Sequence, residues 1–559
     1  GTVTLTDTRD GQTIDFQGGV TIGTLNTAAQ GYNVAFNTGA GGQSSTITNT
    51  VTFNNTGTLT LGNAAGDSIT FTGGVVATAP SSKSIGGTVA ASGAGVINFG
   101  TTGSTITADG TIGGTSTGQI TLAGVTINDG VTLTLGAGAA SPVSAGAIQG
   151  VAGGAASNIT INVADDVANP MVQIASIGTD IGTVTVTQSS GVTVTGTVNA
   201  GTVTLTDTRD GQTIDFQGGV TATSLTTVGQ GYNVAFNTGA GGQTSTITNA
   251  VTFSNTGTLT LGNDAADSIT FTGGVTATAS SAVNTAGTVA TGGGAGQDIN
   301  FGDGDTGVVL TANTTLNAGA VGDITLGGEV NGGFTLALTS TGTTVLQGTV
   351  GNTTALTGVS TNAGGTTQIL TTSIRTSGAQ TWGDAVSIGA PLTLNSGGGS
   401  ITFASTVDAQ NNNLTIAGGT GAGTVTFQGA VSNLGSGTGA ALTVGNGVTG
   451  LIRFQSTLSG NSGIAANNAG NTVQFDDTVT LGDGNTGTAI ATTQFDGLSF
   501  TGYDSLSFGA VTLSGGAVSI ISNGSAITFT TITGAQNLTL NAGATGTITA
   551  SGNVGATPL

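Results

Sequence analysis

The chain has 559 residues, of which 103 are glycine, 5 are proline and only 6% are charged. It contains no cysteine and no histidine, which excludes disulfides, Ser-His-Asp and Cys-His catalysis and the usual zinc ligand sets. Its net charge of −21, with only five basic residues, excludes a basic stripe for nucleic acid and disfavours anionic membrane surfaces.

The residue types indicate an ordered β-protein rather than a disordered or helical one. Apolar residues make up 36% of the chain, which is enough surface to bury. Threonine and valine favour strands, glycine and asparagine favour turns, and frequent glycine opposes helices. No apolar run is long enough for a transmembrane helix. No signal peptide is visible, so we expect a processed chain or a segment of a longer protein.

The first 79 residues contain short alternating runs at 13–16, 33–36, 51–53 and 69–71, each ending in phenylalanine. Alternation places Ile69 and Phe71 on one face of a strand and Thr70 on the other. Glycine and asparagine between the runs are typical of turns. Residues 140–170, flanked by prolines, are the least regular stretch, and we expect a loop there.

Residues 1–79 recur, with scattered substitutions, as residues 201–279. The opening 21 residues are identical in the two copies, GTVTLTDTRDGQTIDFQGGVT. Such duplication without an insertion is typical of an array in which each repeat contacts only its neighbours. The sequence therefore predicts a first repeat unit at 1–200, a second and partly diverged unit at 201–400, and continuing coils at 401–559.

Phenylalanines follow one another at most places by 17 to 21 residues, for example at 36, 53 and 71. This spacing predicts an all-β fold, an elongated parallel β-helix (β-solenoid) with coils of ~20 residues. Phenylalanine and aliphatic side chains would form inward ladders. The alternative is a series of tandem β-sandwich modules, but these have a period of about 100 residues and usually a buried tryptophan in each. This chain has one tryptophan, Trp382.

The motifs ITFTGGV (69–75), IDFQGGV (14–20) and VTFQGAV (425–431) resemble the glycine-rich repeats of filamentous-haemagglutinin-like adhesins and autotransporter passengers. The resemblance covers nearly the whole chain, but not the Asn-Pro-Asn-Gly secretion signature or a C-terminal membrane barrel. It implies an adhesion, filament or surface-coat role on the cell surface of a Gram-negative bacterium. It transfers no catalytic residue.

Carboxylates are the only candidate catalytic groups. Polysaccharide-cleaving enzymes use a pair of them, and the adjacent pairs here are Asp165-Asp166 and Asp476-Asp477. Adjacent residues of a strand point to opposite faces, so neither pair is suitably placed. We therefore predict that the protein is not an enzyme.

Calcium is the one ligand that the sequence predicts, because it binds carboxylates and carbonyls along tight glycine loops. Such loops contain Asp303 and Asp305 (301–307), Asp483 (481–487) and Asp298 (293–298). A second set of candidates is duplicated between the two copies: Asp7, Asp10 and Asp15 in the first, and Asp207, Asp210 and Asp215 in the second. Alternatively these are Asp-Gly turns, with Arg9 and Arg209 pairing with a nearby carboxylate.

The sequence favours a mechanical function: an extracellular, rigid, protease-resistant structure that self-assembles into a surface filament, sheath or S-layer-like coat. Five basic residues leave few sites for trypsin-like proteases. We expect the partner to be the protein itself, both laterally and head-to-tail, with 1–15 stacking on 541–559 of another chain. The alternative is an adhesin stalk that binds host or surface glycans. Exposed Tyr32, Tyr232, Tyr503 or Trp382 would then stack on a polysaccharide, although core packing is the expected role of these residues.

Overall fold

The computed structural model describes residues 1–165, 171–417, 423–445, 447–467 and 470–555. Over these ranges the chain forms strands and turns without a helix, and thus none that could cross a membrane. The chain divides into two compact units. One comprises Gly1–Gly273 with Ala279–Ser281, and the other Gly274–Thr278 with Ala282–Leu559.

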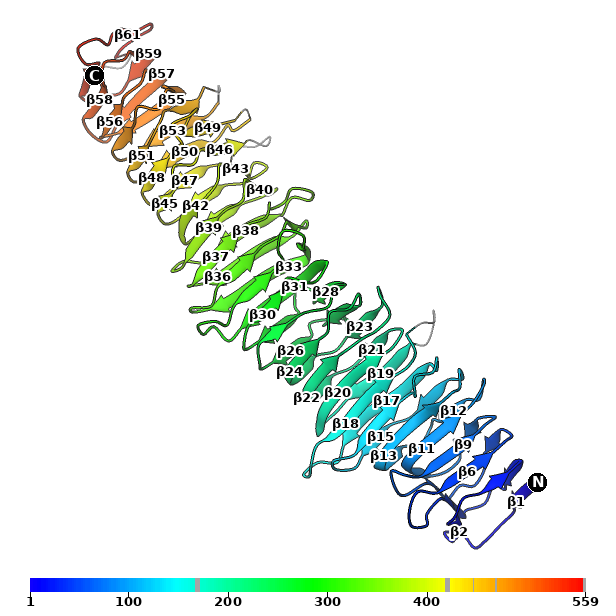
Figure 1. The fold of residues 1–559 in the computed structure, drawn as a ribbon. Coiled ribbons are helices and arrows are strands. Elements are labelled where there is room, and N and C mark those ends of the chain that lie inside the picture. Colours follow the sequence, from blue (N-terminus) through cyan, green and yellow to red (C-terminus); the bar gives the residue numbers. More distant parts are fainter. Residues whose placement is uncertain (166–170, 418–422, 446, 468–469, 556–559) are drawn as a thin grey trace. The chain divides into compact units, whose positions relative to one another are not determined.

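Each coil of the first unit has three faces, which are separate short strands in most coils, while β11 (Ser82–Ala91) spans two faces (Figure 1). One coil is formed by β20 (Ile181–Gln188), β21 (Val192–Val194) and the start of β22 (Val198–Leu205). Each face pairs in parallel with the same face of the next coil, as in the pairs Val184 with Val203, Val192 with Ile214 and Val198 with Val220. This parallel stacking confirms the predicted β-solenoid and excludes the antiparallel β-sandwich alternative.

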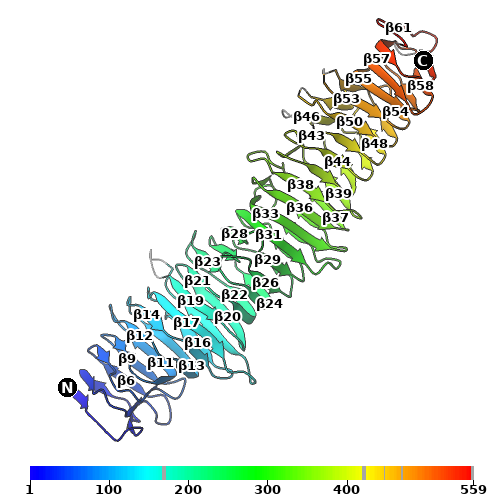
Figure 2. The ribbon, with the colours of Figure 1, turned by 180° about the vertical axis from the view of Figure 1, so that it is seen from behind.

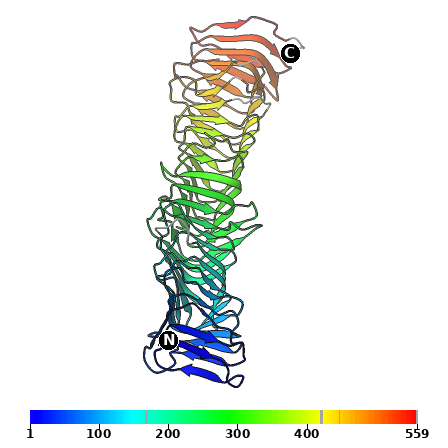
Figure 3. The same cartoon turned by 90° about the vertical axis from the view of Figure 1, so that its right-hand side faces the viewer.

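The two copies of the repeated segment form corresponding strands. The first copy supplies β1 (Thr2–Leu5), β2 (Thr13–Phe16), β3 (Thr21–Ile22), β5 (Asn33–Phe36), β6 (Ser44–Ile47), β8 (Thr58–Leu61) and β9 (Ser68–Phe71). The second supplies the end of β22, then β23 (Thr213–Phe216), β24 (Val220–Thr227), β25 (Asn233–Phe236), β26 (Thr244–Ile247), β28 (Thr258–Leu261) and β29 (Ser268–Phe271). The coils of this unit are drawn from blue to green in Figure 3.

The second unit has the same kind of parallel stacking within it, and one of its faces forms an uninterrupted ladder (Figure 2). The strands of this ladder, in chain order, are β32 (Ile299–Phe301), β34 (Ile324–Leu326), β37 (Thr343–Leu346), β39 (Thr366–Ile369), β42 (Ala385–Ile388), β45 (Val407–Asp408), β48 (Val431–Leu434), β51 (Leu458–Gly460), β54 (Val479–Leu481), β56 (Ser499–Gly502), β58 (Val518–Ser522) and β60 (Leu538–Asn541).

Successive coils are about 22 residues apart, slightly more than the predicted ~20. The step between paired residues varies from coil to coil. Thr13 pairs with Asn33, a step of 20 residues, whereas Val143 pairs with Val172, a step of 29. The longer step includes most of 140–170, which we expected to be a loop. Instead this segment forms β17 (Val143–Gly150) and β18 (Ser157–Asn162), and 166–170 lie outside the described residues.

The interior of each unit contains the predicted aromatic ladders. In the first unit Phe16 stacks on Phe36 with ring centroids 4.8 Å apart. In the second unit Phe427 lies between Phe403 and Phe454, with centroid distances of 4.9 and 4.7 Å and nearly parallel rings. The rings stack because the same inward position recurs in each coil, and parallel pairing places these positions next to one another.

Polar groups hold the longer corners closed in the same way in both copies. Asp67 is 1% exposed and accepts hydrogen bonds from the backbone N–H groups of Gln43, Asn63 and Ala64 at 2.8–2.9 Å. Asp267 accepts the same three bonds in the second copy. Buried backbone donors at these corners therefore have carboxylate partners, which a glycine-rich turn alone would not provide.

Candidate functional site

The predicted calcium ligands lie in separate turns. Asp303 is exposed, and its Oδ1 accepts hydrogen bonds from the N–H groups of Asp305 (3.0 Å) and Thr306 (3.1 Å). Asp298 accepts a bond of 2.9 Å from the N–H of Asp323 in the next coil. Asp483 is exposed in the loop that follows β54. The carboxylate of Asp303 thus caps its own turn, as short polar side chains often do.

Among the duplicated candidates, Asp10 and Asp210 belong to turns, whereas Asp15 and Asp215 lie in strands β2 and β23. The Oδ1 atoms of Asp10 and Asp210 accept hydrogen bonds from the N–H groups of Gly31 (3.2 Å) and Gly231 (3.1 Å). Asp15 accepts hydrogen bonds from the side chains of Thr38 and Gln17, and Asp215 accepts the equivalent bonds from Thr238 and Gln217. Gly11 and Gly211 have φ values of +77° and +75°, so Asp10-Gly11 and Asp210-Gly211 are Asp-Gly turns, as the alternative predicted for these two positions.

The expected pairing of Arg9 and Arg209 with carboxylates is wrong for the described part of the chain. Its one ion pair joins Arg453 Nε to Asp476 Oδ2 at 2.7 Å. Asp476 also accepts a bond of 2.7 Å from Gln474, while Asp477 caps the N–H of Thr478. In the other adjacent pair, Asp166 lies outside the described residues.

Asp207 lies near other charged side chains. This residue lines a surface hollow with Asp165, Arg209 and Asp210, whereas Asp7 at the equivalent place is exposed. Burial, followed by the charges of Asp165 and Asp210, raises the pKa of Asp207 above its ordinary value. Within the described ranges no three acidic side chains converge as a metal site would require. Calcium binding therefore stays a prediction.

Three of the four aromatic residues considered for sugar stacking belong to the interior. Tyr32, Tyr232 and Trp382 are all 0% exposed, and Tyr503 alone is accessible at 42%. The hydroxyl of Tyr32 donates to the carbonyl of Leu5 at 2.8 Å, and Tyr232 bonds to Leu205 at 2.7 Å. Burial raises the pKa of Tyr232 to about 12. The expected core-packing role is confirmed for these three residues.

The first coil presents an apolar edge that the same sequence does not present in its second copy. Four inward-pointing side chains are partly exposed in the first copy: Val3, Ile14, Phe16 and Val20. Their counterparts are at most 1% exposed: Val203, Ile214, Phe216 and Val220. The cause is the coil β20–β22, which covers the second copy, whereas in the first unit no described coil covers β1 and β2.

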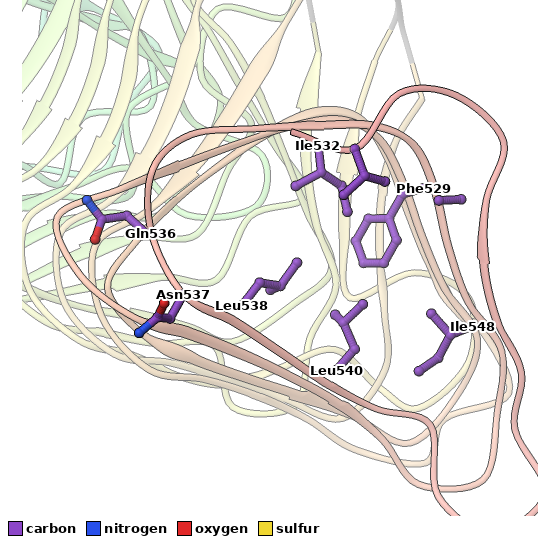
Figure 4. A pocket seen from close by; sticks show the side chains of 9 residues that line it. Phe529, Ile532, Gln536, Asn537, Leu538, Leu540 and Ile548 are labelled. Carbon is purple, nitrogen blue, oxygen red and sulfur yellow. The ribbon is translucent and has the colours of Figure 1, made fainter. Parts of the chain in front are cut away.

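The last described coil presents a second apolar edge. Phe529, Ile532, Leu538, Leu540 and Ile548 point into the coil and line a hollow of about 340 Å³ (Figure 4). Ile548 and Val554 are 48% and 50% exposed. They continue the ladders of Ile527 and Ile532, which are buried beneath them. Residues 556–559, which we expected to join this surface, lie outside the described residues.

Sequence reasoning predicted stacking through residues 1–15 but missed which side chains of the first coil are partly exposed. Residues 181–200, which precede Gly201, supply the coil that covers the second copy. Sequence reasoning also missed the burial of Lys83, which is 1% exposed.

No protein-family model, curated protein or solved structure matches this chain. The β-solenoid fold stands on the structure, and the adhesin-like character stays an expectation from the repeat motifs.

Proposed function

We propose that the protein is an extracellular structural protein of a bacterial surface, which assembles with copies of itself into a filament, sheath or coat. The observation that carries the proposal is the parallel stacking of coils, in which each face pairs with the same face of the next coil. Uncovered parallel strands of this kind readily pair with another chain.

Two further features support a mechanical role outside a cell. The described interior is filled by ladders of aliphatic and aromatic side chains, which resists local opening. The chain offers only five sites to trypsin-like proteases, and one of these, Lys83, is 1% exposed. An adhesin stalk is the competing function, and it needs no contact between copies.

Negative-stain microscopy of the purified chain at increasing concentration distinguishes the two functions. We expect ordered filaments or sheets, whereas single particles at all concentrations would contradict self-assembly and favour the stalk. Ile14→Asp tests the edge directly, because it places a carboxylate where a second chain would have to bury it. We expect the concentration needed for assembly to rise at least ~10-fold, equivalent to about 1.4 kcal/mol.

Thr13→Asp is the matched control for Ile14→Asp. Thr13 lies on the same strand, β2, but its side chain is exposed on the outer surface. We expect this variant to assemble like the unmodified chain, with the same β-rich circular dichroism. Equal loss of assembly in both variants would show that net charge, rather than the apolar edge, controls the process.

A further inference from the structure

We propose that Asp384 is a proton switch inside the second unit. As a neutral carboxyl it holds closed the corner between β41 (Gln380–Trp382) and β42, and its ionisation loosens this corner. The inference concerns the stability of one part of the chain and does not depend on the proposed self-assembly. It is carried by the burial of the carboxyl, by the lack of a cation beside it and by its few hydrogen-bond donors.

Asp384 lies in the interior although its side chain is ordinarily charged in water. It is 1% exposed and directly precedes β42, which pairs in parallel with β39 of the preceding coil (Figure 1). The inward side chains on either side of it in the sequence are Trp382, 0% exposed, and Val386, 3% exposed. An ionised carboxylate in such a place is unfavourable unless a cation or several hydrogen bonds compensate its charge.

The surrounding coils supply no cation. Apart from Asp384, the only charged residue between 330 and 407 is Arg375, which is exposed on the outer side of β40 (Ser373–Arg375). The neighbouring corners, 362–365 and 404–406, contain no titratable residue. In the following coil Asp408 pairs with Ser387, an outward position of β42. Asp384 therefore faces neither a positive nor a negative side chain.

The hydrogen bonds to Asp384 are fewer than those to comparable buried carboxylates. Its Oδ1 accepts a bond of 2.8 Å from the N–H of Gly365, and its Oδ2 lies 3.0 Å from Thr367 Oγ1. Asp67 and Asp267 also directly precede a strand, and each accepts three backbone N–H bonds. A backbone N–H can only donate and so favours a carboxylate, whereas a hydroxyl can donate or accept.

A neutral Asp384 fits these partners. Its Oδ2 hydroxyl can donate to Thr367 Oγ1, while its Oδ1 still accepts from Gly365. The hydroxyl proton of Thr367 then becomes available to Thr344, the paired residue of the preceding coil, whose buried Oγ1 has no partner among the described residues. Burial accordingly raises the pKa of Asp384, although its two hydrogen bonds act in the opposite direction.

The sign of the pH dependence follows from the raised pKa. Between the ordinary aspartate pKa of about 3.9 and the raised value, folded Asp384 keeps a proton that the unfolded segment has lost. Local stability is therefore greatest at acid pH and falls as the pH rises through the folded-state pKa. Above it the charge lies in an apolar interior, and opening of the β39–β42 pairing admits water to it.

Hydrogen exchange of the full chain, corrected for the intrinsic effect of pH, tests the switch. Between about pH 3 and pH 8 we expect protection in 366–369 and 385–388 to fall ~10-fold for each unit by which the folded-state pKa is raised. Asp384→Asn should abolish this fall, because its amide donates to Thr367 and accepts from Gly365, as the neutral carboxyl does. Thr367→Val should keep the fall and move it to higher pH, since the hydroxyl lowers the pKa of Asp384.

Asp267→Asn is the matched control. Both oxygens of Asp267 accept backbone N–H bonds, so an amide nitrogen there would face a donor. We expect this variant to lose protection in 268–271 at every pH. A fall that persists unchanged in Asp384→Asn, or that moves to lower pH in Thr367→Val, would overturn the switch. Loss of protection at both pH values in Asp384→Asn would also overturn it, because Asp384 would then be a carboxylate of the same kind as Asp267.

Discussion

At the scale of single residues, the strongest departure from an apolar interior is Lys83. Its side chain is 1% exposed in β11 (Ser82–Ala91), and its Nζ donates to Thr102 Oγ1. Burial lowers its pKa from 10.5 to about 8. The next coil places Ser104 beside it, with a buried hydroxyl that has no partner. In the second unit the corresponding pair is Val283 and Val308, both at most 1% exposed.

We expect Lys83→Met to raise the free energy of unfolding by about 1–3 kcal/mol at pH 7, because it removes a buried amine without a carboxylate partner. Thr102 keeps its own donor satisfied, since its hydroxyl bonds to the carbonyl of Pro80 at 2.7 Å. The reciprocal change, Val283→Lys, should lower the free energy of unfolding. Denaturant unfolding of both variants measures the two effects.

The pH dependence gives a second measurement on the same variant. Between pH about 8 and 10.5 the unfolded chain binds a proton at Lys83 that the folded chain does not. The stability of the unmodified chain should therefore rise with pH across this window, and Lys83→Met should remove this part of the rise. An unchanged slope in the variant would mean that the amine is not the group responsible.

At the scale of strands, the aromatic ladder of the second unit is the clearest element. Phe427 lies in β47 (Val425–Phe427), stacked between the rings of Phe403 and Phe454. We expect Phe427→Ala to cost about 3–5 kcal/mol locally, because it leaves a cavity that two neighbouring coils border. Hydrogen exchange should quicken in 401–403, 425–427 and 451–454.

Residues 13–16 and 33–36 serve as the internal reference, because stacked coils contact only their neighbours. Their exchange should stay unchanged in Phe427→Ala. Phe427→Leu fills part of the space and should have a smaller effect at the same strands. Uniform acceleration throughout the chain would mean that the coils unfold as one cooperative body.

The strands and their inward faces were predictable from sequence, whereas the corners and the exceptions were not. Alternation at 69–71 and the spacing of phenylalanines determine which side chains point inward. The number of residues in a coil depends on the length of its turns, and turn length follows no regular period in the sequence. The 29-residue step from Val143 to Val172 is an example. Lys83 is buried because it pairs with Leu59 in the preceding coil and with Ser104 in the next one. These pairings are visible only in the three-dimensional structure.

At the scale of the whole molecule, the same coil sequence occurs twice, at residues 1–21 and 201–221. The inward side chains of 201–221 are buried because the coil formed by residues 181–200 covers them. Removing everything before Gly201 should therefore expose a new edge with the sequence of the old one. In a stacked array such a deletion leaves the remaining neighbour contacts intact. Assembly should thus depend on which coil is exposed and not on how many coils the chain has.

We expect the chain of residues 201–559 to keep β-rich circular dichroism and to form filaments like those of the full chain. Ile214→Asp should block assembly of the shorter chain, as Ile14→Asp does in the full one. A folded 201–559 chain that stays single at every concentration would show that the duplicated edge does not drive assembly.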